Sequence, residues 1–115
     1  MSHRLIHYRQ RAIVRQNGRC FYCGLPVVPK ENLDNFALLH GLSPARAGAL
    51  QCTAEHLQAR CDGGPDKEEN IVAACITCNQ RRHRMKPAPA PDTYAKIVRG
   101  QMERGAWHKR PLLRA

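Results

Sequence analysis

Two C-x-x-C pairs constrain the fold of this chain more than any other feature. Cys20 and Cys23 form the first pair, Cys75 and Cys78 form the second, and 51 residues separate them. Four thiolates in this pattern are typical of a closed, tetrahedral Zn²⁺ site. A redox-active pair of the thioredoxin type would need a βαβ context, which this sequence does not show. We therefore expect structural zinc to join a turn near residue 20 to the start of a helix near residue 75.

The charge of the chain is strongly basic and unevenly distributed. The 115 residues carry a formal net charge of +10, with +5 in residues 1–19, −3 in residues 20–80 and +8 in residues 81–115. Basic flanks around a mildly acidic centre are typical of a protein that binds a polyanion and keeps carboxylates for a metal site. The expected partner is nucleic acid; the alternative is that the charge serves solubility alone.

The N-terminus has no apolar core of a secretory signal, and no apolar run approaches the roughly 18 residues of a membrane span. We therefore expect a cytoplasmic protein without a membrane partner, in which structural disulfides are not formed. Outside the two pairs, Cys52 and Cys61 are expected to be small buried apolar residues.

The hydrophobic pattern predicts a small α+β fold whose centre is a strand, a loop, a strand and a helix. The first strand is expected over residues 49–56 and the second over residues 71–74, with the intervening loop turning at Gly63-Gly64-Pro65. The helix that follows begins at Cys75 and ends near Lys86, because Pro87 cannot continue it.

The flanking segments are expected to be mainly helical. An apolar stripe predicts a helix over residues 3–17 that stops at Asn17-Gly18. Residues 25–28 are expected to form a short strand, and a short helix is expected near residues 31–40. Residues 1–86 are expected to form one domain with its core in residues 49–86, and residues 87–115 a Pro-rich linker and a basic helical tail. Asp92 is expected to cap the helix of this tail and Gly105 to end it.

The order and spacing of five residues resembles the HNH endonuclease family, whose core is a ββα-metal fold. In that family an acidic or His ligand directly precedes a catalytic His, as Glu55 precedes His56 here. An Asn follows fourteen positions after the His, which corresponds to Asn70, and a helix then carries two metal ligands four residues apart, which correspond to Asn79 and His83. Zinc-containing members are similar in having cysteine knuckles that flank this core.

The resemblance implies a role for each of these residues. His56 would be the general base that activates water, and a His side chain suits this because its unperturbed pKa is about 6.5. Glu55, Asn79 and His83 would hold a catalytic Mg²⁺, Mn²⁺ or another divalent ion, although His83 could instead contact phosphate or lie in solvent. Asn70 would bond backbone groups across the loop and hold His56 in place. The family more often has Asp or His in place of Glu55.

Basic residues surround the same motif. In the family the last helix enters the minor groove of DNA, where Arg and Lys neutralise phosphates without reading bases. The candidates for such contacts are Arg81, Arg82, Arg84 and Lys86 on the helix and Arg60 and Lys67 in the loop.

These features predict a metal-dependent endonuclease that hydrolyses DNA and, as the resemblance implies, leaves a 5′-phosphate and a 3′-hydroxyl. RNA is not excluded as a substrate, and the protein is expected to be a monomer or a weak homodimer. The alternative is a zinc-stapled nucleic-acid-binding module whose HNH site is degenerate. A pure binding module has no need of Glu55, His56, Asn79 and His83 together.

Overall fold

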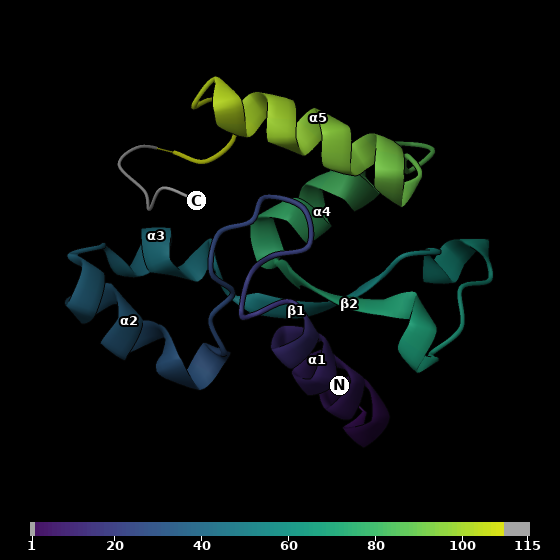
Figure 1. Ribbon diagram of the computed structural model, residues 1–115, viewed down its shortest axis with the longest axis horizontal. Coiled ribbons are helices and arrows are strands. Elements are labelled where there is room, and N and C mark those ends of the chain that lie inside the picture. The colour runs from purple at the N-terminus through teal and green to yellow at the C-terminus, as the bar shows by residue number, and fades with distance from the viewer. Residues whose placement is uncertain (1, 110–115) are drawn as a thin grey trace.

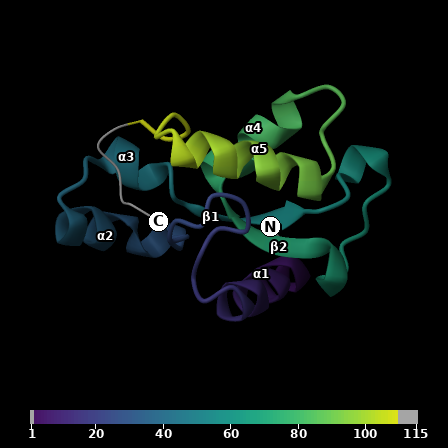
Figure 2. The ribbon, with the colours of Figure 1, turned by 45° about the horizontal axis from the view of Figure 1, so that its top comes forward.

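The computed structural model describes residues 2–109 and shows a two-stranded antiparallel sheet packed between helices. The elements are α1 (His3–Arg15), α2 (Leu33–His40), α3 (Pro44–Gly48), β1 (Cys52–His56), β2 (Ile71–Cys75), α4 (Ile76–Arg84) and α5 (Pro91–Glu103). Helix α1 lies on one side of the sheet, and α4 and α5 lie on the other (Figure 1); Figure 2 shows the same layers from a second direction. Within the described residues, no helix has both the length and the apolar character needed to cross a membrane.

The two strands form a hairpin that pairs Cys52 with Cys75 at one end and His56 with Ile71 at the other. All five residues of β2 are buried, because α1 packs against this strand and α4 begins directly at its end. The loop between the strands contains two short 3₁₀ turns, Arg60–Asp62 and Glu68–Asn70. The hairpin therefore presents the Glu55-His56 pair at the end of β1, beside the loop.

The outer edge of β2 is completed by a side chain. Gln16 follows α1, and its side-chain amide donates to the carbonyl of Ala73 at 2.8 Å and accepts from the Ala73 N–H at 2.9 Å. The Phe21 N–H also donates to the Ala73 carbonyl, at 3.0 Å. Since buried backbone groups must find partners, Gln16 takes the place of a third strand at this position.

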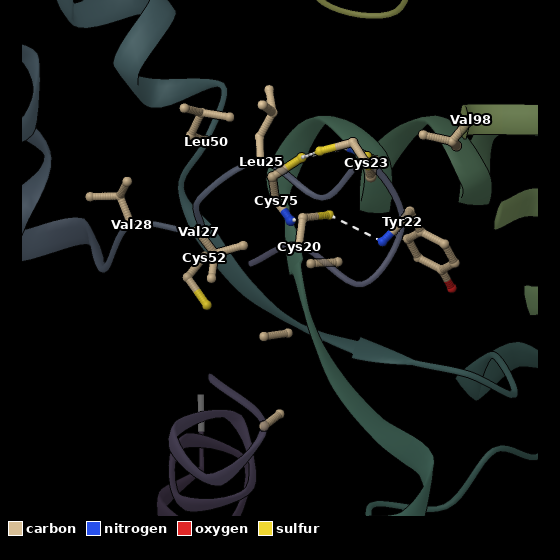
Figure 3. Packing of buried hydrophobic residues seen from close by; sticks show 14 of the residues in the cluster. Cys20, Tyr22, Cys23, Leu25, Val27, Val28, Leu50, Cys52, Cys75 and Val98 are labelled. Atoms are coloured by element: carbon tan, nitrogen blue, oxygen red, sulfur yellow. Dashed lines mark hydrogen bonds between the residues drawn. The ribbon is translucent and has the colours of Figure 1, made fainter. Parts of the chain in front are cut away.

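The hydrophobic core lies where the turn around residue 20, the end of β2 and helix α5 meet. It contains the four paired cysteines together with Tyr22, Leu25 and Leu50, all buried. Tyr94 and Val98 of α5 are fully buried in the same cluster, and Val98 lies near the cysteines in Figure 3. The segment that we described from sequence as a linker and tail thus contributes to the core; its last residues, 110–115, lie outside the described part of the chain.

The α+β fold and the order of its central elements are confirmed. The stop at Asn17-Gly18 is also confirmed, since both residues have positive φ. The short strand predicted over residues 25–28 is wrong, because Pro26 and Val28 make only isolated bridges. Asp92 is not a cap, since α5 begins at Pro91 and Asp92 lies in its first turn. Helix α3 was not predicted; its cap is Ser43, whose side chain accepts from the Arg46 N–H.

Replacing Gln16 with Leu should destabilise the protein. The substitution leaves both backbone groups of buried Ala73 without the amide partner, which costs about 1–3 kcal/mol for an unsatisfied buried group. Urea unfolding of the metal-loaded protein measures the loss. Gln10→Leu, at an exposed position of the preceding helix α1, is the matched control and should leave the free energy of unfolding nearly unchanged. Equal stability of the two variants would contradict the role given to Gln16.

Candidate functional site

The four cysteines of the two C-x-x-C pairs meet at one point. Cys20 and Cys23 lie on a tight turn that Gly24 closes with a φ of 77°, a conformation that glycine adopts without strain. Cys75 is the last residue of β2 and Cys78 lies in the first turn of α4. All four side chains are buried, and their Sγ atoms lie within 4.8 Å of one another. The cysteines are therefore positioned to hold a metal ion, as the sequence predicted.

Hydrogen-bond donors point at the sulfur atoms. Cys20 Sγ accepts from the backbone N–H groups of Tyr22 (3.4 Å) and Cys75 (3.3 Å), and Cys78 Sγ accepts from the Trp107 indole N–H at 3.3 Å. Figure 3 shows the Tyr22 N–H directed at Cys20. Such donors stabilise thiolates and orient metal ligands. A buried set of four sulfurs fits a tetrahedral thiophilic ion such as Zn²⁺.

The close contacts between the four sulfur atoms shift the pKa values of their thiols in opposite directions. The hydrogen bond with Cys20 lowers the pKa of Cys23, and hydrogen bonds with Cys20 and Cys23 raise the pKa of Cys78. The cluster cannot lose all four protons unless a cation compensates the charge. Of the two other cysteines, Cys52 is buried, and burial raises its pKa to about 11. The prediction that Cys61 is buried is wrong, because it lies exposed in the loop.

A second cluster surrounds Glu55, whose side chain is 1 % exposed. Its Oε2 accepts from the Tyr22 hydroxyl at 3.0 Å and from Arg82 Nη1 at 3.1 Å. Its Oε1 lies 2.8 Å from His83 Nε2. Burial and the neighbouring carboxylate raise the pKa of the Tyr22 phenol, so its hydroxyl stays protonated and donates. The cluster joins the cysteine turn, β1 and α4.

Helix α4 and strand β1 match each other along one face. Asn79 Nδ2 donates to Thr53 Oγ1 at 3.0 Å, and His83 meets Glu55 one step further along. Four helical residues rise about 6 Å and two strand residues about 6.8 Å. The spacing from Asn79 to His83 on the helix therefore matches the spacing from Thr53 to Glu55 on the strand. Residues two apart on a strand share a face. The structure therefore brings Glu55 and His83 together and places Asn79 on the same face.

His56 makes its contact with a residue that we did not single out from sequence. Its Nε2 lies 2.7 Å from Asp66 Oδ1, and Arg60 Nη2 donates to Asp66 Oδ2 at 3.0 Å. The hydrogen bond with His56 holds the pKa of Asp66 below its usual value, so the carboxylate accepts and Nε2 carries the proton. The side chain of His56 is 12 % exposed. No spacing rule marks Asp66, because the shape of the loop brings it back to His56.

The loop that carries Asp66 folds tightly against the end of β1. A Cβ at Gly64 would lie 1.8 Å from the Gln58 carbonyl oxygen, so only glycine fits at this position. Asn70 fastens the loop: its Oδ1 accepts from the Gln58 N–H at 2.8 Å, and its Nδ2 donates to the carbonyls of Gln58 and Pro65 at 3.1 and 3.0 Å. Asn70 thus bonds backbone groups across the loop next to His56.

The basic candidates differ in exposure. Arg82 is 3 % exposed and donates to Glu55 and to the carbonyls of His56, Leu57 and Pro89, so it is an interior residue of this site. Arg81 donates to the Trp107 carbonyl, and its guanidinium lies 4.7 Å from the centroid of the Trp107 ring. The remaining four candidates are exposed: Arg60, Lys67, Arg84 and Lys86.

A comparison with known protein families finds a match in the central segment of the chain. Residues 43–85 match the family model described as HNH endonuclease. The matched range runs from Ser43 before α3 through the hairpin to Met85 after α4, and it includes Glu55, His56 and the second cysteine pair but not Tyr22. No curated protein and no solved structure matches the chain. The match confirms the HNH resemblance for this segment and indicates nuclease-type activity in general.

The purified protein should contain about one thiolate-bound zinc ion per chain, and Cys78→Ser should lose it together with the fold. Zinc in such sites contributes roughly 10–16 kcal/mol of binding free energy at neutral pH. This contribution should be lost as the pH falls, because protons compete with zinc for the thiolates. Elemental analysis and circular dichroism measure both effects.

The matched control for this experiment is Cys61→Ser, because Cys61 is exposed and lies outside the cluster. This variant should keep the full zinc content and the wild-type spectrum. Retention of zinc and fold by Cys78→Ser would contradict the assignment of the metal centre.

Proposed function

We propose that the protein is a metal-dependent endonuclease that hydrolyses phosphodiester bonds of DNA, because residues 43–85 match the HNH endonuclease family model. The observation that carries the proposal is the contact between the buried Glu55 carboxylate and His83 of α4. Glu55 directly precedes His56 in the sequence, so this contact lies next to the proposed base. A nuclease needs a charge-neutralising ion and a water-activating base close together. The products would be a 5′-phosphate and a 3′-hydroxyl, in keeping with the family.

The donor set near Glu55 fits a hard divalent ion. Glu55 Oε1 and His83 Nε2 lie 2.8 Å apart, a separation compatible with two ligands on one ion, and Asn79 offers an amide oxygen from the same face of α4. Carboxylate, amide and imidazole donors suit Mg²⁺, Mn²⁺ or another divalent ion. When bound, such an ion would polarise the scissile phosphate and assist the leaving oxygen. Zinc is the ion that we propose for the four cysteines.

His56 is the proposed general base, and its tautomer follows from its partner. Since Nε2 donates to Asp66, Nδ1 of the neutral ring carries the lone pair that can accept a proton from water. Asp66 is then a positioning residue that fixes the ring. Asn70 supports the same geometry by holding the loop against residues 58 and 65.

The proposed nucleic-acid contacts are the basic side chains that are exposed to solvent. Arg84 at the end of α4, Lys86 just after it and Lys67 of the loop are exposed and available to phosphates. Arg60 is also exposed, but it is paired with Asp66. Arg81 is a weaker candidate because its guanidinium lies over the Trp107 ring. Arg82 is interior and is not a proposed contact. DNA is the proposed substrate, and RNA is a second polyanion that the same surface could bind. We also propose that the protein acts in the cytoplasm, as a monomer or a weak homodimer.

One observation favours the alternative of a binding module with a degenerate site. Arg82 forms a buried ion pair with Glu55, and this positive charge opposes the binding of a cation to the same carboxylate. A protein of this kind would keep the four cysteines and the basic surface but would cleave nothing. The presence of His83 and an Asp66-oriented His56 beside Glu55 favours the nuclease.

Wild-type protein should convert supercoiled plasmid to nicked or linear DNA with Mg²⁺ or Mn²⁺ and not with EDTA. His56→Ala should abolish cleavage, because the base is removed, and should retain zinc and DNA binding. Gel analysis of plasmid measures cleavage, and a mobility shift measures binding. His40→Ala, an exposed histidine of α2, is the matched control. Binding without cleavage by the wild type under every metal would support the binding module instead.

Asp66→Asn should slow cleavage by at least about tenfold, because an amide can present its N–H to Nε2 and stabilise the wrong tautomer of His56. DNA affinity and zinc content should stay unchanged. Single-turnover nicking rates measure the effect, and Asp62→Asn, an exposed acid in the same loop, is the control. A normal rate for Asp66→Asn would exclude Asp66 from positioning the base.

A further inference from the structure

Tyr22 lies inside the cysteine turn, yet its hydroxyl points to the other cluster. The residue is flanked by the ligand pair Cys20 and Cys23 and is 0 % exposed. Its ring packs edge-on against Tyr94, with centroids 4.9 Å apart. Figure 3 shows its hydroxyl directed away from the cysteine sulfurs, and the hydroxyl donates to Glu55 Oε2 at 3.0 Å. Tyr22 is therefore a direct connection between the two clusters.

The two carboxylate oxygens of Glu55 have different partners. A carboxylate oxygen accepts about two hydrogen bonds, and Oε2 already has Tyr22 and Arg82 as donors. Oε1 faces His83 Nε2 and is the oxygen that remains for a cation. Because both donors hold Oε2, the carboxylate cannot rotate without breaking two buried hydrogen bonds.

We propose that Tyr22 is a positioning residue for the nuclease metal: its hydroxyl fixes Glu55 so that Oε1 alone, beside His83, binds the divalent ion. This inference rests on the proposed function. It makes the metal-binding turn of residues 20–23 part of the second site, through a single hydrogen bond. It also explains the use of Glu at position 55, because the longer side chain contacts Tyr22, Arg82 and His83 at once.

Tyr94 offers a matched control within the same core. It is also 0 % exposed and carries a buried hydroxyl, which donates to the Cys78 carbonyl at 2.6 Å. Tyr22→Phe and Tyr94→Phe thus remove the same group from two rings that pack on each other. Only the first substitution changes the contacts of Glu55. A loss of metal affinity that is specific to Tyr22→Phe separates positioning of Glu55 from general core stability.

The experiment is calorimetric titration of Mn²⁺ into the zinc-loaded full-length protein without DNA. Tyr22→Phe should weaken Mn²⁺ binding by about tenfold, the lower end of the effect seen when a partner of a metal ligand is removed. Tyr94→Phe should bind Mn²⁺ as the wild type does. Both variants should keep one zinc per chain. Equal Mn²⁺ affinity of Tyr22→Phe and wild type would overturn the proposal.

Glu55→Asp provides a second, independent measurement. The shorter side chain cannot keep all three contacts, so Mn²⁺ affinity should fall although the charge is unchanged. An affinity equal to or above that of the wild type would show that the Tyr22 contact is not needed and would overturn the proposal.

The outcomes also separate this inference from the proposed function. If Tyr22→Phe binds Mn²⁺ normally while wild type nicks plasmid and His56→Ala does not, the nuclease stands and the positioning role fails. If the wild type binds no Mn²⁺ and nicks nothing, both fail, because Glu55 then serves only its buried ion pair.

Discussion

The structure depends on the convergence of four sulfur atoms from three segments of the chain. The turn at residues 20–23, the end of β2 and the first turn of α4 meet there, and α5 packs over them. Four thiolates in one buried space repel one another unless a cation compensates their charge. A chain of 115 residues with two Phe, three Tyr and one Trp has few aromatic side chains for a core, so a metal ion bound at this junction would supplement its apolar packing. Such an ion would also hold the start of α4 in place, and with it Asn79 and His83.

A second constraint is the buried ion pair between Glu55 and Arg82. Both side chains are almost inaccessible, and their burial is tolerated because each polar atom finds partners. Arg82 joins β1, the loop and the segment before α5 through three carbonyl groups. Removing one partner of such a pair costs roughly 3–5 kcal/mol, since it leaves an unpaired buried charge. Arg82 therefore belongs to the framework of the site and is not a surface contact.

The sequence was sufficient where local chemistry determines the result. The two cysteine pairs, the hairpin with its glycine turn and the Asn17-Gly18 stop follow from ligand spacing and backbone preference, and the structure confirms them. Other features depend on tertiary placement. Arg81, Arg82 and Arg84 are equivalent in a helical pattern, and only the packing of α4 on β1 shows that Arg82 is buried. Asp66 belongs to no motif, and Tyr22 is a variable position of the first C-x-x-C pair. Their roles depend on the path of a loop and on the orientation of a ring, which residue spacing does not show.

If Tyr22 and Arg82 hold one oxygen of Glu55 and only the other can bind an ion, metal binding and nucleic-acid binding should depend on each other. Under the proposed function, the protein offers the ion few donors, and Arg82 offsets part of the Glu55 charge. Such ions complete their coordination with water and with phosphate oxygens of the substrate. The ion should therefore bind weakly to the free protein and more tightly when a phosphodiester is present. By linkage, the ion must increase the affinity for DNA by the same factor. A site built in this way would restrict hydrolysis to the moment when base, ion and phosphate are assembled, and Tyr22 and the start of α4 would link it to the four cysteines.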